Sequence, residues 1–90
     1  MVNNSLLEEP AIIEVASADP SIPNRKLAGT IQTRANKSLT LITSQEIAAA
    51  VAVWVQTKDL LTLGQVLHCF REPDATWTVH VRVDRTLLVI

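Results

Sequence analysis

The sequence predicts an all-β fold, a small antiparallel β-barrel of about five to six strands with a flexible N-terminal arm. Two candidate hairpins in the 90-residue chain support this prediction. In each of them, apolar and polar residues alternate on both sides of a short polar turn, which is typical of half-buried antiparallel strands. A chain of this length holds one domain, and its 48% apolar content is enough to fill one core.

The first 24 residues are predicted to form an arm that is partly disordered or contains at most one edge strand. They include Pro10, Pro20 and Pro23, and their apolar residues are concentrated at positions 12–16. Proline has no backbone N–H to donate to a neighbouring strand, so it is confined mostly to sheet edges and turns. The barrel domain is therefore expected over residues 25–90.

The first hairpin is predicted from residue 25 onward. Alternation runs from Leu27 to Ala35, breaks at the polar pair Asn36-Lys37, and resumes from Leu39 to Thr43. Two strands joined by a tight turn at residues 36–37 account for this pattern.

Residues 43–61 allow two interpretations. A helix is favoured by the capping-box pattern from Thr43 to Glu46 and by the alanines at 48–50. A strand is favoured by Val51, Val53 and Val55, which are β-branched and recur at every second position. We favour a strand over residues 50–56. The helical alternative would make the chain an α+β subunit of an obligate assembly.

This strand would be apolar on both faces. Its second face would carry Ala50, Ala52 and Trp54, and a small barrel can cover only one face of a strand with its own core. We therefore expect Ala50, Ala52 and Trp54 to contact a protein partner or a second copy of the chain.

The second hairpin comprises residues 60–70 and 76–84 around the turn at 71–75. A turn centred on Pro73 predicts an apolar face and a polar face. The apolar face would pair Cys69 with Trp77, Leu67 with Val79, Gln65 with Val81 and Leu63 with Val83. The polar face would pair Thr62 with Asp84, Gly64 with Arg82, Val66 with His80 and His68 with Thr78.

Composition excludes several classes of function. The net charge is −1, the aromatic residues are two Trp and one Phe, and the charges are scattered, so a surface for a nucleic acid polymer is not expected. The longest apolar run, residues 47–55, is far shorter than the roughly 20 residues that span a bilayer. A single Cys and the lack of a signal-peptide pattern predict a cytoplasmic protein without membrane insertion.

The sequence offers no catalytic or metal-binding group. Gly29 and Gly64 are its only glycines, so a glycine-rich phosphate loop is excluded. His68 and His80 would be diagonal neighbours on one face, whereas Cys69 would project from the other. Two histidines are too few for a closed zinc site, which needs four ligands. We expect no metal, no catalytic residue, no resident cofactor and no enzymatic activity.

Residues 57–71, followed by 77–83, resemble the closing strands of PilZ domains. Gly64, Val66 and Cys69 have the spacing of the last three residues in the family's Leu-x-Gly-x-Val-x-x-Cys strand, and the resemblance extends back to about Ala28. It implies a six-stranded barrel in bacterial signalling. It also implies cyclic di-GMP binding through an Arg-x-x-x-Arg motif and an Asp/Asn-x-Ser-x-x-Gly motif, which supply forked cations and short polar groups.

This chain departs from both PilZ motifs. Arg25 is followed at the required offset by Gly29, and the residues aligned with the second motif are Thr33, Ala35 and Ser38. Shifting that alignment by three residues recovers Asn36 and Ser38 but places Leu41 where the family has Gly.

The resemblance therefore leads to a non-catalytic signalling module that acts by protein–protein interaction, with weak or absent cyclic di-GMP binding. The alternative is a true cyclic di-GMP receptor with a variant site made of Arg25, Lys26, Asn36 and Ser38. In that alternative the basic pair Arg25-Lys26, where the arm meets the barrel, would reach over the barrel mouth to a phosphate or a guanine.

Overall fold

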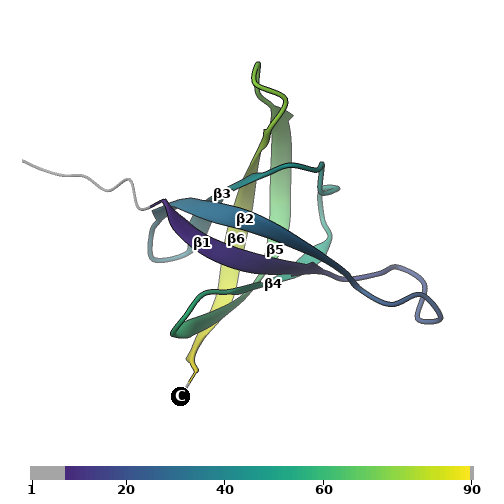
Figure 1. The fold of residues 1–90 in the computed structure, drawn as a ribbon. Coiled ribbons are helices and arrows are strands. Elements are labelled where there is room, and N and C mark those ends of the chain that lie inside the picture. The colour runs from purple at the N-terminus through teal and green to yellow at the C-terminus, as the bar shows by residue number, and fades with distance from the viewer. Residues whose placement is uncertain (1–7, 90) are drawn as a thin grey trace, which may run out of the picture.

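The computed structural model describes residues 8–89, and the described chain consists of six strands without a helix. They are β1 (Glu9–Val15), β2 (Arg25–Arg34), β3 (Ser38–Thr43), β4 (Ala52–Gln56), β5 (Leu60–Arg71) and β6 (Trp77–Leu88) (Figure 1). They close into a barrel in the order β1-β2-β3-β6-β5-β4, and every neighbouring pair is antiparallel. The predicted all-β barrel is confirmed.

β1 closes the barrel. It pairs with β2 on one side and with β4 on the other, so the expectation of an edge strand in the N-terminal arm is wrong. Ala11, Ile13 and Val15 point inward and are buried, while Ile12 is exposed. The barrel therefore includes residues that precede Arg25. Residues 1–7 of the predicted arm lie outside the described residues.

The β2–β3 hairpin has the predicted turn. β2 ends at Arg34 and β3 begins at Ser38, with the Ala35 amide donating to the Ser38 carbonyl oxygen at 2.9 Å. Leu27, Ile31, Leu39 and Leu41, all from the alternating set, are buried. The alternation therefore identified both the strands and their inward faces.

The segment between β3 and β5 is a loop followed by a strand, so the helical alternative is wrong. Thr43 does not cap a helix, because its hydroxyl donates to the Gln45 carbonyl oxygen at 2.7 Å. Ile47 is fully buried, and Ala50 has a left-handed φ of 70°. The buried side chain of Ile47 and the left-handed backbone of Ala50 therefore interrupt the segment that favoured a helix. β4 begins after them, at Ala52.

The β5–β6 hairpin has a different register from the predicted one. Arg71 pairs with Trp77, so the turn is centred on Asp74 and not on Pro73. Two bulges then shift the pairing, one between Leu63 and Gly64 and one between Val66 and His68.

The second bulge, whose extra residue is Leu67 of β5, reverses the predicted faces of β5 over its first part. Thr62, Gly64 and Val66 are the buried positions there, whereas Leu67 is exposed. After the second bulge Cys69 packs against the core, and in β6 Val79 and Val81 are buried as predicted.

The turn at Asp74 includes a strained alanine. The Glu72 amide donates to the Thr76 carbonyl oxygen at 2.8 Å, and Ala75 has a φ of 69°. The Asp74 carboxylate accepts hydrogen bonds from the hydroxyl and the amide of Thr76, which lowers the pKa of Asp74. A left-handed residue with a Cβ costs on the order of 1 kcal/mol, which glycine avoids.

The Ala75→Gly variant is therefore expected to raise the free energy of unfolding by about 0.5–1 kcal/mol. Urea denaturation followed by tryptophan fluorescence measures this change. As a control, Ala28→Gly changes an exposed position within β2 and should lower the free energy of unfolding by a similar amount. A loss of stability in Ala75→Gly equal to that of Ala28→Gly would contradict the assigned turn.

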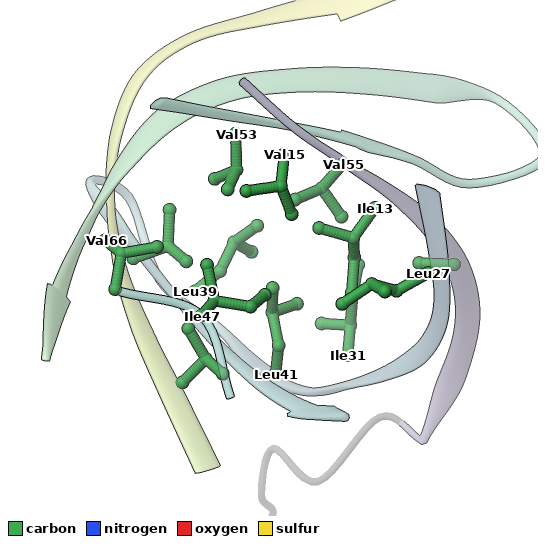
Figure 2. Packing of buried hydrophobic residues seen from close by; sticks show 13 residues of the cluster. Ile13, Val15, Leu27, Ile31, Leu39, Leu41, Ile47, Val53, Val55 and Val66 are labelled. Atoms are coloured by element: carbon green, nitrogen blue, oxygen red, sulfur yellow. The ribbon is translucent and has the colours of Figure 1, made fainter. Parts of the chain in front are cut away.

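The barrel interior is filled by aliphatic side chains. Figure 2 shows the inward-pointing residues of the strands, with Ile47 from the β3–β4 loop packed among them. The cluster consists of Ala11, Ile13, Val15, Leu27, Ile31, Leu39, Leu41, Ile47, Val53, Val55, Val66, Val79 and Val81. A polar ligand or a partner would therefore bind on the outside of the barrel or at its rims.

Candidate functional site

The four residues predicted to bind cyclic di-GMP do not form one site. Arg25 and Lys26 begin β2, whereas Asn36 and Ser38 lie around the turn at the other end of the same hairpin. A strand rises about 3.3 Å per residue, so the two pairs are on the order of 30 Å apart. One ligand of nucleotide size cannot contact both pairs.

Arg25 and Lys26 also have local roles. The Arg25 guanidinium donates to the Glu46 carbonyl oxygen at 3.1 Å and to Gln45 Oε1 at 3.4 Å, which ties the β3–β4 loop to the start of β2. Lys26 lies opposite Glu14 in the register of β1 and β2. The hydrogen bonds of Arg25 give it a structural function at the barrel mouth.

A hollow of about 730 Å³ lies outside the barrel between the β2–β3 hairpin and the β5–β6 turn. Its lining includes Glu72 and Asp74 but no Lys or Arg. It is lined by Gln32, Thr33, Thr40, Ile42, Glu72, Pro73, Asp74, Thr76, Thr78 and His80. Two carboxylates without a cation repel a phosphodiester, so this hollow does not suit cyclic di-GMP.

His68 and His80 form a directly opposed pair, not the diagonal pair that was predicted. Their ring centroids are 4.8 Å apart, and Phe70 packs 4.9 Å from His68. Cys69 packs against the core, so it cannot complete a site with them. Within residues 8–89, His, Cys, Asp and Glu side chains nowhere gather in groups of three that could hold a metal ion.

Apolar side chains lie on the outside of the neighbouring strands β1, β4, β5 and β6. Residues directly opposite each other on neighbouring strands point to the same side of the sheet. One row across these four strands reads Glu14, Trp54, Leu63 and Arg85, and the next reads Ile12, Gln56, Leu61 and Leu87. We call these eight residues the Trp54 face.

Of the three residues predicted to form an interface, only Trp54 belongs to the Trp54 face. Trp54 lies near its centre and is half-buried, and Ala52 is exposed further along β4. Ala50 is exposed but precedes the strand, where its carbonyl oxygen accepts a hydrogen bond from Gln65 Nε2 at 2.9 Å. Ile12 is 51% exposed and Leu87 is 41% exposed, so the surface is open to a partner.

A shallow cavity of about 210 Å³ adjoins Trp54. It is lined by Ile12, Glu14, Lys26, Trp54, Gln56 and Leu61. Its lining combines an indole ring and aliphatic side chains with one carboxylate and one ammonium group, and the Glu14 carboxylate also accepts a hydrogen bond from Asn24 Nδ2 at 2.9 Å.

Sequence reasoning found Trp54 but missed its neighbours. Ile12 was assigned to the arm, and Leu63 was expected inside the barrel, although the structure places both on the outer face. The alternation of β1 and β5 was visible in the sequence. Which of the two alternating faces points into the barrel was not visible, because the bulges and the β1–β4 pairing that decide it are tertiary features.

Comparisons of the chain with known protein families, with curated proteins and with solved structures find no match to any of them. In residues 8–89 there is also no helix of the length and apolarity that a membrane crossing requires. What the protein does is therefore inferred from its own residues.

Proposed function

We propose that the protein is a non-catalytic, PilZ-like module of bacterial signalling in the cytoplasm that acts by protein–protein contact, with weak or absent cyclic di-GMP binding. The Trp54 face is the observation that supports this role most directly. Contiguous exposed apolar residues with charged groups at their margin are typical of protein interaction surfaces. The closed six-stranded barrel agrees with what the PilZ resemblance implies.

The nucleotide-receptor alternative has less support. Its four residues lie in two groups at opposite ends of one hairpin, and Arg25 is already engaged with the β3–β4 loop. Losing one charged hydrogen-bonding group from a binding site costs about 1.5–3 kcal/mol. A single arginine at the barrel mouth would therefore leave an affinity weaker than micromolar.

A catalytic role has no support from the side-chain arrangement. The thiol of Cys69 packs toward the core, and the neighbouring imidazole of His68 lies on the exposed side of β5. A nucleophile and its base must lie within hydrogen-bonding distance of each other. The proposal therefore assigns binding, and not chemistry, to this barrel.

Isothermal titration of cyclic di-GMP into the purified chain at moderate salt tests the nucleotide part of the proposal. We expect no binding heat at ligand concentrations up to about a millimolar, because the separated polar groups cannot converge on one ligand. The Arg25→Ala variant is titrated alongside, with Lys37→Ala in the β2–β3 turn as the matched control. Micromolar binding that Arg25→Ala abolishes and Lys37→Ala retains would overturn the proposal in favour of a receptor.

A further inference from the structure

The two histidines of the chain lie opposite each other on neighbouring strands. The sequence contains His68, His80 and no other histidine. The register of β5 and β6 pairs them directly, and their ring centroids are 4.8 Å apart. We propose that His68 and His80 form an open binding site for a late divalent transition-metal ion such as Ni²⁺ or Cu²⁺. This site is separate from the Trp54 face and does not rest on the proposed interaction role.

The position of the β5–β6 turn makes the two histidines partners. Arg71 pairs with Trp77 across the turn, and the same register places His68 opposite His80. A turn centred one residue earlier would leave the two imidazoles diagonal, which is the arrangement that the sequence predicted. Val79 of β6 is buried, so its neighbour His80 points to the outer side of the barrel. Residues directly opposite each other share one side of the sheet, so His68 points outward as well.

The spacing of the two rings suits a shared ion. Two imidazole nitrogens that bind one ion at about 2.0–2.1 Å, the usual zinc–nitrogen distance, lie about 3 Å from each other. With the ring centroids 4.8 Å apart, nitrogens at the facing edges of the two rings can reach this separation. None of the side-chain hydrogen bonds and ion pairs among residues 8–89 involves either imidazole. Rotation about the Cβ–Cγ bonds can therefore turn one nitrogen of each ring toward the ion without breaking such a contact.

The surroundings of the pair favour a cation. His80 lines the hollow of about 730 Å³ beside the β5–β6 turn, whose lining includes Glu72 and Asp74 but no Lys or Arg. These carboxylates accept hydrogen bonds from the hydroxyls of Thr78 and Thr76, at 2.7 and 2.6 Å. Their negative charge lowers the electrostatic energy of a nearby cation. Since no third His, Cys, Asp or Glu within residues 8–89 joins the pair, the hollow leaves the other positions of the ion to water.

Imidazole ligands select the class of ion. The affinity of nitrogen ligands for first-row ions rises from Co²⁺ through Ni²⁺ to Cu²⁺, whereas Mg²⁺ and Ca²⁺ prefer oxygen. The expectation of no metal rested on the four protein ligands of a closed zinc site, and an open site that binds water needs fewer. A hydrogen-bond partner on the second nitrogen of a metal-bound histidine strengthens binding about 10–100-fold. Since the described side chains supply no such partner here, we expect micromolar affinity and rapid exchange of the ion.

Isothermal titration of Ni²⁺ into the full chain, without a histidine tag, tests this inference. One equivalent of Ni²⁺ is expected to bind with a micromolar dissociation constant. His68→Gln and His80→Gln should each weaken binding at least tenfold, because a single imidazole lacks the second ligand that holds the ion after the first has bound. Mg²⁺ titrated under the same conditions should give no binding heat, because it prefers oxygen ligands.

A relocated histidine supplies the matched control. The double variant His68→Gln/Lys58→His keeps two histidines in the chain but separates them by the length of β5, on the order of 30 Å, since Lys58 lies in the turn before that strand. It should bind Ni²⁺ as weakly as His68→Gln. Ni²⁺ should raise the midpoint of thermal unfolding of the wild-type protein but not of this variant, because only an opposed pair binds the ion better in the folded state. Circular dichroism checks that each variant retains its strands.

The spectrum of bound Cu²⁺ counts the ligands directly. Cys69 is the one thiol of the chain, and Cys69→Ala removes it so that Cu²⁺ is not reduced. In this variant, electron paramagnetic resonance should show hyperfine splitting from two imidazole nitrogens. Adding His68→Gln should leave the splitting of one, a change that a merely structural role of His68 would not produce.

Three outcomes would overturn the inference. They are no binding of Ni²⁺ up to about a millimolar, binding that His68→Gln and His80→Gln both retain, or equal binding by the wild-type protein and the variant with the relocated histidine. The cyclic di-GMP titration involves neither histidine, so the failure of the metal site and the failure of the proposed function remain distinguishable.

Discussion

Replacing Ile13 by alanine is expected to lower the free energy of unfolding by about 2–5 kcal/mol, the range for truncating a large aliphatic side chain in a packed core. Ile13 is fully buried at the centre of β1, between Leu27 of β2 and Val55 of β4. Small domains unfold with only about 5–15 kcal/mol in total. This one substitution therefore removes a large fraction of the stability.

The neighbouring residue supplies the control. Ile12→Ala deletes the same atoms from a side chain that is 51% exposed, so its effect should stay within about 0.5–1 kcal/mol. Both variants are unfolded with urea at the same low protein concentration. Equal and small losses would mean that residues 9–15 are a loosely attached arm and not a strand of the barrel.

Adding a methyl group at Gly64 is expected to be at least as damaging. A Cβ built at this position would lie 2.3 Å from the Arg82 carbonyl oxygen and 2.7 Å from Val81 Cγ1. The first of these atoms belongs to the backbone of β6 and cannot move without breaking the β5–β6 pairing. We expect Gly64→Ala to destabilise the fold by about 3 kcal/mol or more, at the upper end of the range for overpacking.

Gly29→Ala is the matched comparison for Gly64→Ala. Its added Cβ would lie 2.6 Å from Ile13 Cδ1, the mobile end of a side chain, and 3.0 Å from the Ile42 carbonyl oxygen. Rotation of Ile13 can relieve the closer contact, so the cost should be about 1–2 kcal/mol. Thermal unfolding followed by circular dichroism compares the two variants. A smaller loss at Gly64 than at Gly29 would show that β6 does not approach β5 as closely as the bulged register requires.

A bulge within β5 decides which of its side chains point outward. Its extra residue is Leu67, because Val66 pairs with Val81 and His68 pairs with His80. This bulge puts Thr62, Gly64 and Val66 inside the barrel and Leu63 outside it. If β5 were regular and paired as the sequence suggested, Leu63 would face the core and would be absent from the Trp54 face.

The candidate site was only partly predictable. Trp54 stood out because an aromatic residue on the second face of an otherwise buried strand needs a partner. Arg25, Lys26, Asn36 and Ser38 were grouped because a family motif suggested it, yet the length of β2 keeps the two pairs apart.

The sequence by itself determined the all-β class, the β2–β3 hairpin and the existence of the β5–β6 hairpin. These features depend on two-residue alternation and on turn residues, which act over a few positions along the chain. The tertiary structure alone decided that β1 closes the barrel, which face of β5 turns inward and which side chains share the outer surface. Alternation shows which residues lie on a common face, but long-range strand pairing and bulges decide where that face points.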